Sequence, residues 1–170
     1  MMSFPFVVRA ETSTDAPEIE SLLDVAFGPG RFAKTAYRLR EGVPHDPRLS
    51  FVAIAGDRLV GSVRLTAIRI GDAPALLLGP LAVAPHFTSR GAGRELVRTS
   101  LDAARVDGHR LVLLVGDRPY YGPLGFEPVP PGQITMPGPV DPARLLACPL
   151  VPGALTETRG AACRIAPAVV

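Results

Sequence analysis

The feature that most constrains this chain is an apolar segment that passes through a glycine turn into an amphipathic helix and a second apolar segment. "ALLLGPLAV" (75–83) precedes "SRGAGR" (89–94), which opens a helical pattern running to Asp107, and "LVLLV" (111–115) follows. This order predicts a strand–helix–strand unit whose two strands are parallel neighbours joined by a right-handed crossover. The apolar stripe of the predicted helix consists of Leu96, Val97, Leu101 and Ala104.

The segments before this unit predict an antiparallel start to the same sheet. "FPFVVRA" (4–10) reads as a strand, and "APEIESLLDVAF" (16–27) has apolar residues at helical spacing. A weaker helix is expected over residues 31–41. Two β-rich runs between 49 and 70 flank a turn at Gly56-Asp57-Arg58 and predict a hairpin. The expected fold is therefore α/β (α+β), with a mixed, mostly antiparallel central sheet flanked by helices.

The last part of the chain differs in composition. Residues 128–144 are proline-rich and predict a loop, and "LLACPL" (145–150) and "AACRIA" (161–166) predict two short strands. A chain of 170 residues suits one domain. We expect a core over residues 1–130 and a C-terminal β extension over 131–170, packed on the same domain.

Composition excludes several classes of function. The net charge is +2, which gives no electrostatic footprint for nucleic acid. No apolar run approaches the length of a membrane span, and the N-terminus lacks a secretory signal pattern. We therefore expect a cytoplasmic protein with no membrane or metal partner. Cys148 and Cys163 are expected to be reduced, mostly buried thiols, although a disulfide is possible.

The glycine turn at 89–94 supports two interpretations. A helix N-terminus presents unpaired N–H groups, glycines allow close backbone approach, and Arg90 and Arg94 add positive charge, so the turn could bind a phosphate. An ordinary strand-to-helix turn with glycines for tight packing would look the same. The turn has neither the G-x-G-x-x-G spacing of a dinucleotide fold nor the G-K-[ST] of a P-loop.

Taken together, "LGPLAVAPHFTSRGAGRELV" and "LVLLVGDRPYYGPLGFEPV" resemble the GNAT superfamily of acyl-CoA-dependent N-acetyltransferases. The likeness is strongest to its compact YhbS-like branch, covers residues from about 5 to 130, and extends to the C-terminal tail. It implies a single-domain GNAT fold with a splayed parallel strand pair at the acyl-CoA site, and acetyl-CoA as cosubstrate.

The resemblance also implies site residues. Backbone amides at 89–93 would hold the coenzyme A pyrophosphate, and the strand at 81–83 would pair with the pantetheine arm. Two positions depart from the family pattern, because Thr88 replaces a glutamine and Pro123 an arginine. The implied cofactor-binding residues are Leu81, Ala82, Val83, Thr88, Ser89, Arg90, Gly91, Ala92, Gly93 and Arg94.

Tyr121 matches the position of the family's general acid, which would protonate the leaving thiolate. Tyr120 is expected to pack or to contact the cofactor. An amide near Leu81 or Ala82 would polarise the thioester carbonyl. The family's strand glutamate is absent, so we expect a water relay without a dedicated base.

Four other side chains could serve as that base, and for each a structural role is expected instead. These are Asp117 (a helix N-cap), His86 (an exposed loop residue), and Glu20 and Asp24 (a solvated helix face).

The sequence thus predicts an acyl-CoA-dependent N-acetyltransferase in which a primary amine of a small molecule or peptide attacks acetyl-CoA directly in a ternary complex. The alternative is a catalytically weak acyl-CoA-binding sensor or interaction module. A monomer or a homodimer is expected.

Overall fold

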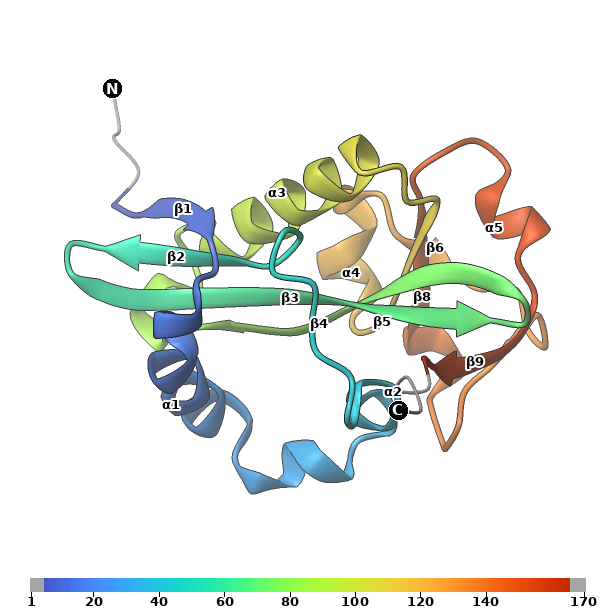
Figure 1. Ribbon diagram of the computed structural model, residues 1–170, viewed down its shortest axis with the longest axis horizontal. Coiled ribbons are helices and arrows are strands. Elements are labelled where there is room, and N and C mark those ends of the chain that lie inside the picture. The colour runs from blue at the N-terminus through green and yellow to red at the C-terminus, as the bar shows by residue number, and fades with distance from the viewer. Residues whose placement is uncertain (1–4, 166–170) are drawn as a thin grey trace, which may run out of the picture.

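The computed structural model describes residues 5–165 and shows a mixed sheet with helices on both faces (Figure 1). The strand order within these residues is β1-β2-β3-β4-β5-β8-β6, with β9 on β3 and β7 on β9. The strands are β1 (Val7–Ala10), β2 (Phe51–Ala55), β3 (Arg58–Ile70), β4 (Ala73–Val83), β5 (Leu111–Val115), β6 (Glu127–Pro128), β7 (Ile134–Thr135), β8 (Leu145–Pro149) and β9 (Gly160–Arg164). The helices are α1 (Ala16–Phe27), α2 (Thr35–Arg40), α3 (Ala92–Val106), α4 (Arg118–Tyr121) and α5 (Ala154–Glu157), with 3-10 turns that include η2 (Pro29–Ala33) and η3 (Pro85–Phe87).

Strands β2, β3 and β4 form an antiparallel meander built on two-residue turns, and β1 pairs antiparallel with β2. Gly56 and Gly71 open the turns of the β2–β3 and β3–β4 hairpins, and both have positive φ angles, of 63° and 59°. Glycine takes this conformation without the steric cost that a side chain imposes, and each of the two is followed by an aspartate. The predicted hairpin over 49–70 is confirmed.

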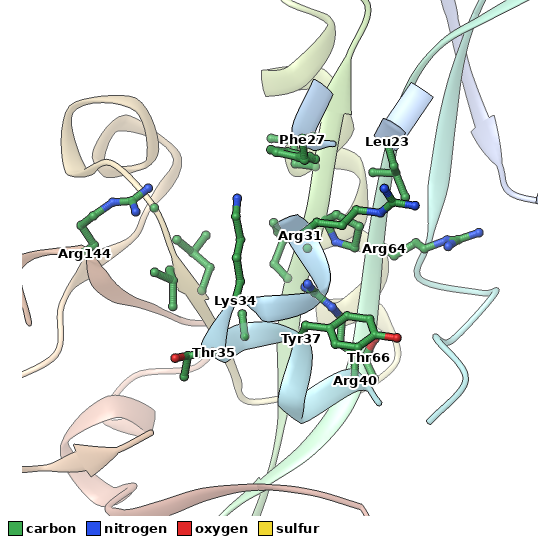
Figure 2. A pocket seen from close by; sticks show the side chains of 18 of the residues that line it. Leu23, Phe27, Arg31, Lys34, Thr35, Tyr37, Arg40, Arg64, Thr66 and Arg144 are labelled. Carbon is green, nitrogen blue, oxygen red and sulfur yellow. The ribbon is translucent and has the colours of Figure 1, made fainter. Parts of the chain in front are cut away.

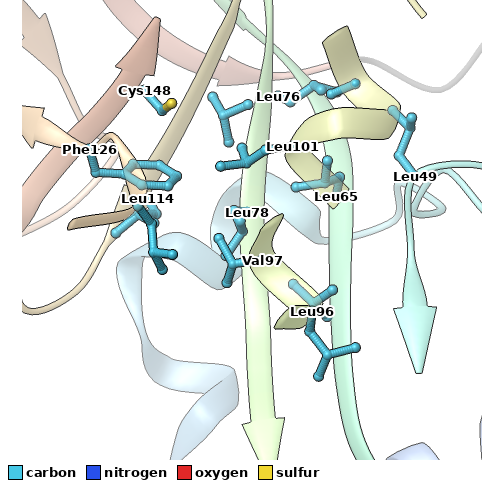
Figure 3. Packing of buried hydrophobic residues seen from close by; sticks show 14 of the residues in the cluster. Leu49, Leu65, Leu76, Leu78, Leu96, Val97, Leu101, Leu114, Phe126 and Cys148 are labelled. Carbon is cyan, nitrogen blue, oxygen red and sulfur yellow. The ribbon is translucent and has the colours of Figure 1, made fainter. Parts of the chain in front are cut away.

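The core has two layers because successive strand residues point to opposite faces. Leu76 and Leu78 of β4 pack with Val97 and Leu101 of α3 on one face (Figure 3). Leu77 lies on the other face, in the cluster that contains Leu39 of α2. Helix α1 covers the same side as α2, so the sheet lies between α3 and the N-terminal helices (Figure 1).

The parallel pair of the predicted strand–helix–strand unit is confirmed, but it is short. Strand β4 pairs with β5 only at Leu76–Val112 and Leu77–Leu113. Against β3, the pairing shifts between Leu78 and Leu81, where β4 carries one extra residue. This bulge bends β4 away from β5 and places a gap at the carboxyl end of the parallel pair.

The tail completes the sheet at two places. Strand β8 lies between β5 and β6, and β9 pairs antiparallel with residues 68–70 of β3. The two strands predicted over 145–150 and 161–166 are confirmed as far as the structure describes them. Residue 166, the first four residues of the chain and the outer ends of the expected domain boundaries lie outside the described residues.

Three expectations need correction. The helix expected over 31–41 is α-helical only from Thr35 to Arg40, because Lys34 is extended and separates α2 from η2. The proline-rich loop contains the short strand β7, which pairs with β9. Both cysteines are free, but only Cys148 is buried, since the alternation along β9 turns Ala162 inward and Cys163 outward.

None of the helices within residues 5–165 is both long enough and apolar enough to cross a membrane.

The packing of the tail against the core can be tested at Gly71. A Cβ at this position would lie 2.7 Å from the carbonyl oxygen of Arg159, whereas a Cβ at Gly56 would meet nothing within 4 Å. Both residues have positive φ, so Gly56→Ala measures the backbone cost alone, about 1–2 kcal/mol. We expect Gly71→Ala to lower the free energy of unfolding by about 1–3 kcal/mol more than Gly56→Ala, in denaturant titrations. Equal losses would show that the tail does not press on this turn in solution.

Candidate functional site

A cleft of about 1030 Å³ opens where β4 and β5 diverge. Its floor is formed by the ends of the two strands, including Leu78, Gly79 and Leu81 of β4 and Leu114 and Val115 of β5. Helices α1 and α2 form one wall, and the loop around residues 139–144 forms another. Figure 2 shows Arg31, Tyr37, Arg40 and Arg64 gathered on one side of this pocket and Arg144 on the other. The cleft therefore joins the glycine turn to the N-terminal helices.

The glycine turn begins α3 at the mouth of the cleft. Gly91 is the N-cap residue and has φ +85°, in the left-handed region that glycine favours. No side chain caps the helix, so the N–H groups of its first turn have no partner within the helix. Thr88 lines the cleft, and its hydroxyl donates a hydrogen bond to the Pro85 carbonyl oxygen at 3.1 Å. The turn thus offers exposed backbone donors and the positive end of a helix dipole.

The second glycine of the turn, Gly93, serves packing rather than backbone conformation. It is buried, and a Cβ there would overlap the Tyr120 hydroxyl and touch Val83 at 3.5 Å. The absence of a side chain lets α3 start directly against Tyr120. The Arg94 guanidinium lies 5.8 Å from the centre of the Tyr120 ring, which places a cation at the same edge.

Tyr121 lies beside Tyr120 at the end of α4. Its ring makes edge contacts with Tyr120 and Phe126, with centroids 4.8 and 5.7 Å apart, and packs on Gly116. Burial raises the pKa of the Tyr121 phenol to about 12, and the nearby Tyr120 and Asp117 add to this rise. The hydroxyl makes no hydrogen bond within residues 5–165, although the residue lines the cleft. It is therefore a protonated donor with no competing acceptor.

Sequence reasoning missed a charged network beside the cleft, two members of which, His45 and Arg64, line it. Glu11, which follows β1 and is only 7% exposed, accepts hydrogen bonds from Arg64 at 2.7 and 3.2 Å. The His45 Nε2 atom lies 3.1 Å from the same carboxylate. Burial opposes ionisation of Glu11, but the hydrogen bonds from His45 and Arg64 outweigh it and hold its pKa below the usual value.

No local motif marks this network. Glu11, His45 and Arg64 come from three separate segments, and only the fold brings them together.

The bases considered from the sequence have other partners. Asp117 occupies the N-cap position of α4 as expected, but its carboxylate does not cap the helix. It accepts a bond from the Arg144 Nε atom at 3.3 Å instead, because the neighbouring loop brings that guanidinium alongside. His86 is exposed in η3, as expected, and is not part of the cleft lining.

Glu20 and Asp24 of α1, the other two candidate bases, are exposed, and both bind Arg31. The distance to Arg31 is 3.1 Å for Glu20 and 2.6 Å for Asp24. Glu20 lines the cleft, whereas Asp24 does not.

Helix α2 is tied to the opposite loop across the cleft. The Thr35 hydroxyl donates to the Pro139 carbonyl oxygen at 2.7 Å, and Arg38 donates to the Pro137 carbonyl oxygen at 2.7 Å. Gly138 permits this approach, because a Cβ there would lie 2.8 Å from the Thr35 hydroxyl. Among residues 5–165, no group of three or more His, Cys, Asp or Glu side chains is placed to hold a metal ion.

Comparison with known proteins identifies a family. Residues 16–126 match the Acetyltransferase (GNAT) family. The chain is 32% identical over 127 residues to "Uncharacterized N-acetyltransferase YjhQ" of Escherichia coli K12, which covers 72% of this chain and 70% of that protein. It is 31% identical over 126 residues to "Uncharacterized N-acetyltransferase YhbS" of the same strain, covering 71% and 73%.

Solved structures show the same fold. The crystal structure of Escherichia coli YhbS in complex with CoA aligns with a TM-score of 0.82 and 25% identity, covering 97% of this chain and 92% of that one. A GNAT family acetyltransferase from Brucella melitensis in complex with acetyl-CoA aligns with a TM-score of 0.69 and 24% identity, over 96% and 98%. The latter likeness concerns the fold alone.

The contact between Gly93 and Tyr120 gives a test of this part of the site. We expect Gly93→Ala to lower the free energy of unfolding by about 1–3 kcal/mol, because the added methyl group must displace the Tyr120 hydroxyl. Tyr120→Phe removes that oxygen and leaves the next ring atom, Cζ, 3.6 Å from the new methyl group. In the Tyr120→Phe background, Gly93→Ala should therefore be nearly neutral. Equal costs in both backgrounds would contradict this packing.

Proposed function

Because the chain belongs to the GNAT acetyltransferase family, we propose that it transfers an acetyl group from acetyl-CoA to a primary amine of a small molecule or peptide. The observation that carries this proposal is the juxtaposition of three features in one cleft. These are the diverging strands β4 and β5, the exposed amides of the turn that opens α3, and the buried phenol of Tyr121.

The residues present fit acetyl-CoA as cosubstrate. The N–H groups of residues 89–93 would hold the pyrophosphate, since a helix N-terminus with a left-handed glycine favours anions. The edge of β4 at Leu81, Ala82 and Val83 faces the gap without a strand beside it, so the pantetheine arm could pair there. Thr88, Ser89, Arg90, Ala92 and Arg94 surround the same turn. That the similar YhbS structure is a complex with CoA supports a coenzyme A thioester as the cosubstrate.

The proposed reaction needs few groups. The neutral amine attacks the thioester carbonyl carbon, an amide near Leu81 or Ala82 polarises the carbonyl, and the carbon–sulfur bond breaks. Tyr121 gives its proton to the departing thiolate, and with a pKa of about 12 the phenol is protonated throughout the physiological range. The proton lost by the amine passes to water in the cleft, with His45 as a side chain able to receive it.

We also propose that residues 131–170 are an extension of the core over residues 1–130 rather than a separate unit. Strands β8 and β9 support this, because they pair with β5 and β3 of the core.

Acetyl-CoA binding and thiol release with a panel of primary amines test the proposed function, and Tyr121→Phe tests its chemistry. The substitution removes one oxygen and keeps the ring packing. We expect kcat to fall by roughly 100- to 10,000-fold while acetyl-CoA affinity is retained, because the lost contact forms only as the thiolate leaves.

Tyr120→Phe is the matched control for this substitution, because it removes the hydroxyl of the neighbouring tyrosine. We expect it to change kcat far less than Tyr121→Phe does. A Tyr121→Phe variant with wild-type kcat would remove the phenol from the mechanism. Tight acetyl-CoA binding with no turnover by the wild-type protein would favour the sensor alternative.

A further inference from the structure

The cleft carries an excess of positive charge. Six cationic side chains line it against three carboxylates. The cations are Arg31, Lys34, Arg38, Arg40, Arg64 and Arg144.

Most of these cations have an acceptor from the protein. Arg31 binds Asp24 and Glu20, Arg64 binds Glu11, and Arg144 binds Asp117. Arg38 donates to a carbonyl oxygen of the opposite loop. These groups are neutralised or held, so they leave little charge for a ligand.

Two cleft cations, Lys34 and Arg40, have no acceptor among the described residues, but Lys34 is exposed and its ammonium lies over the Phe27 ring, whereas Arg40 is half-buried. Within residues 5–165 its guanidinium makes no hydrogen bond and no ion pair. Burial lowers its pKa to about 10, and the nearby Arg64 also lowers it. A half-buried cation without an anion has lost part of its hydration with no compensating partner, and the five N–H donors of its planar fork can bind a carboxylate through two parallel hydrogen bonds. The Arg40 guanidinium therefore has the geometry to bind a carboxylate, and none of the described residues supplies one.

The position of Arg40 relates it to the reacting groups. Its Nη1 atom would lie 2.9 Å from a Cβ built on Gly79, so the guanidinium occupies the space that a side chain at this point of β4 would fill. Gly79 belongs to the bulged part of β4, where the strand leaves β5. Figure 2 shows Arg40 beside Tyr37 and Thr66, on the side of the pocket opposite Arg144. An anion bound here would sit next to the diverging strands.

We propose that Arg40 binds a carboxylate carried by one of the two reactants, close to the bond being formed. This inference rests on the proposed acetyl transfer. The carboxylate has two possible sources: an acceptor that bears it beside its amine, as an amino acid does, or a dicarboxylic acyl group on coenzyme A. In both cases Arg40 is a specificity residue rather than a proton carrier.

The experiment compares matched ligands in two arms, each read by calorimetric binding and by thiol release. The acceptor arm uses L-amino acids and the matching amino-acid amides, with acetyl-CoA as donor. The acyl arm uses malonyl-CoA and succinyl-CoA against acetyl-CoA. The variants are Arg40→Gln, Arg40→Lys, and Lys34→Gln as a control that removes another cleft cation with no carboxylate partner.

In one arm we expect the wild-type protein to prefer the carboxylate-bearing ligand by about 10- to 100-fold, the range for a hydrogen bond to a charged group. Arg40→Gln should abolish the preference, Arg40→Lys should keep part of it, and Lys34→Gln should leave it unchanged. The melting temperature of Arg40→Gln should not fall, because the substitution removes an unpaired, half-buried charge.

No preference in either arm, or a preference that survives Arg40→Gln, would overturn the inference. Equal transfer to amino acids and amides, together with no preference for malonyl-CoA or succinyl-CoA over acetyl-CoA, would refute the carboxylate site while supporting acetyl transfer. Conversely, Arg40-dependent binding of amino acids by a protein that does not bind acetyl-CoA would support the site and refute the proposed function.

Discussion

The separation of β4 from β5 after two paired positions is the constraint on which the rest of the site depends. Beyond Leu77 and Leu113, the facing edges of β4 and β5 no longer pair with each other. Backbone groups in such a gap must be satisfied by water or by a ligand. The bulge between Leu78 and Leu81 holds the strands apart, and α3 begins at the open end. A gap lined by free backbone groups and closed by a helix N-terminus suits an extended ligand with an anionic end.

Ion pairs fix the walls of this gap. Glu11, Arg64, Glu20 and Arg31 link the segment after β1, strand β3, helix α1 and the turn η2 in one charged series. The pairs of Arg64 with Glu11 and Glu20 join β3 to segments far from it in the chain, so the series helps to hold α1 beside the sheet. Arg40 stands at the end of the same wall without an acid. Among the arginines of this cleft within the described residues, Arg40 is the one whose guanidinium has no hydrogen-bond acceptor, which favours a role in binding a ligand.

The sequence predicted the elements whose signal is local. The glycine turn, the stripe of α3 and the apolar run of β5 each lie within a short window, and the family resemblance rests on them. The charged network could not be predicted in this way, since Glu11, His45 and Arg64 meet only through the pairing of β1, β2 and β3. Asp117 shows the same limit. The sequence around it predicts a helix-capping side chain, but its carboxylate binds Arg144, which comes from a segment distant in the sequence.

The most direct test of this account is a crystal structure of the protein with acetyl-CoA. The account predicts the pyrophosphate on the amides of residues 89–93, the pantetheine arm along residues 81–83 of β4, and the thioester within reach of the Tyr121 hydroxyl. A cosubstrate bound elsewhere, or bound with its thioester away from the gap between β4 and β5, would contradict the central claim.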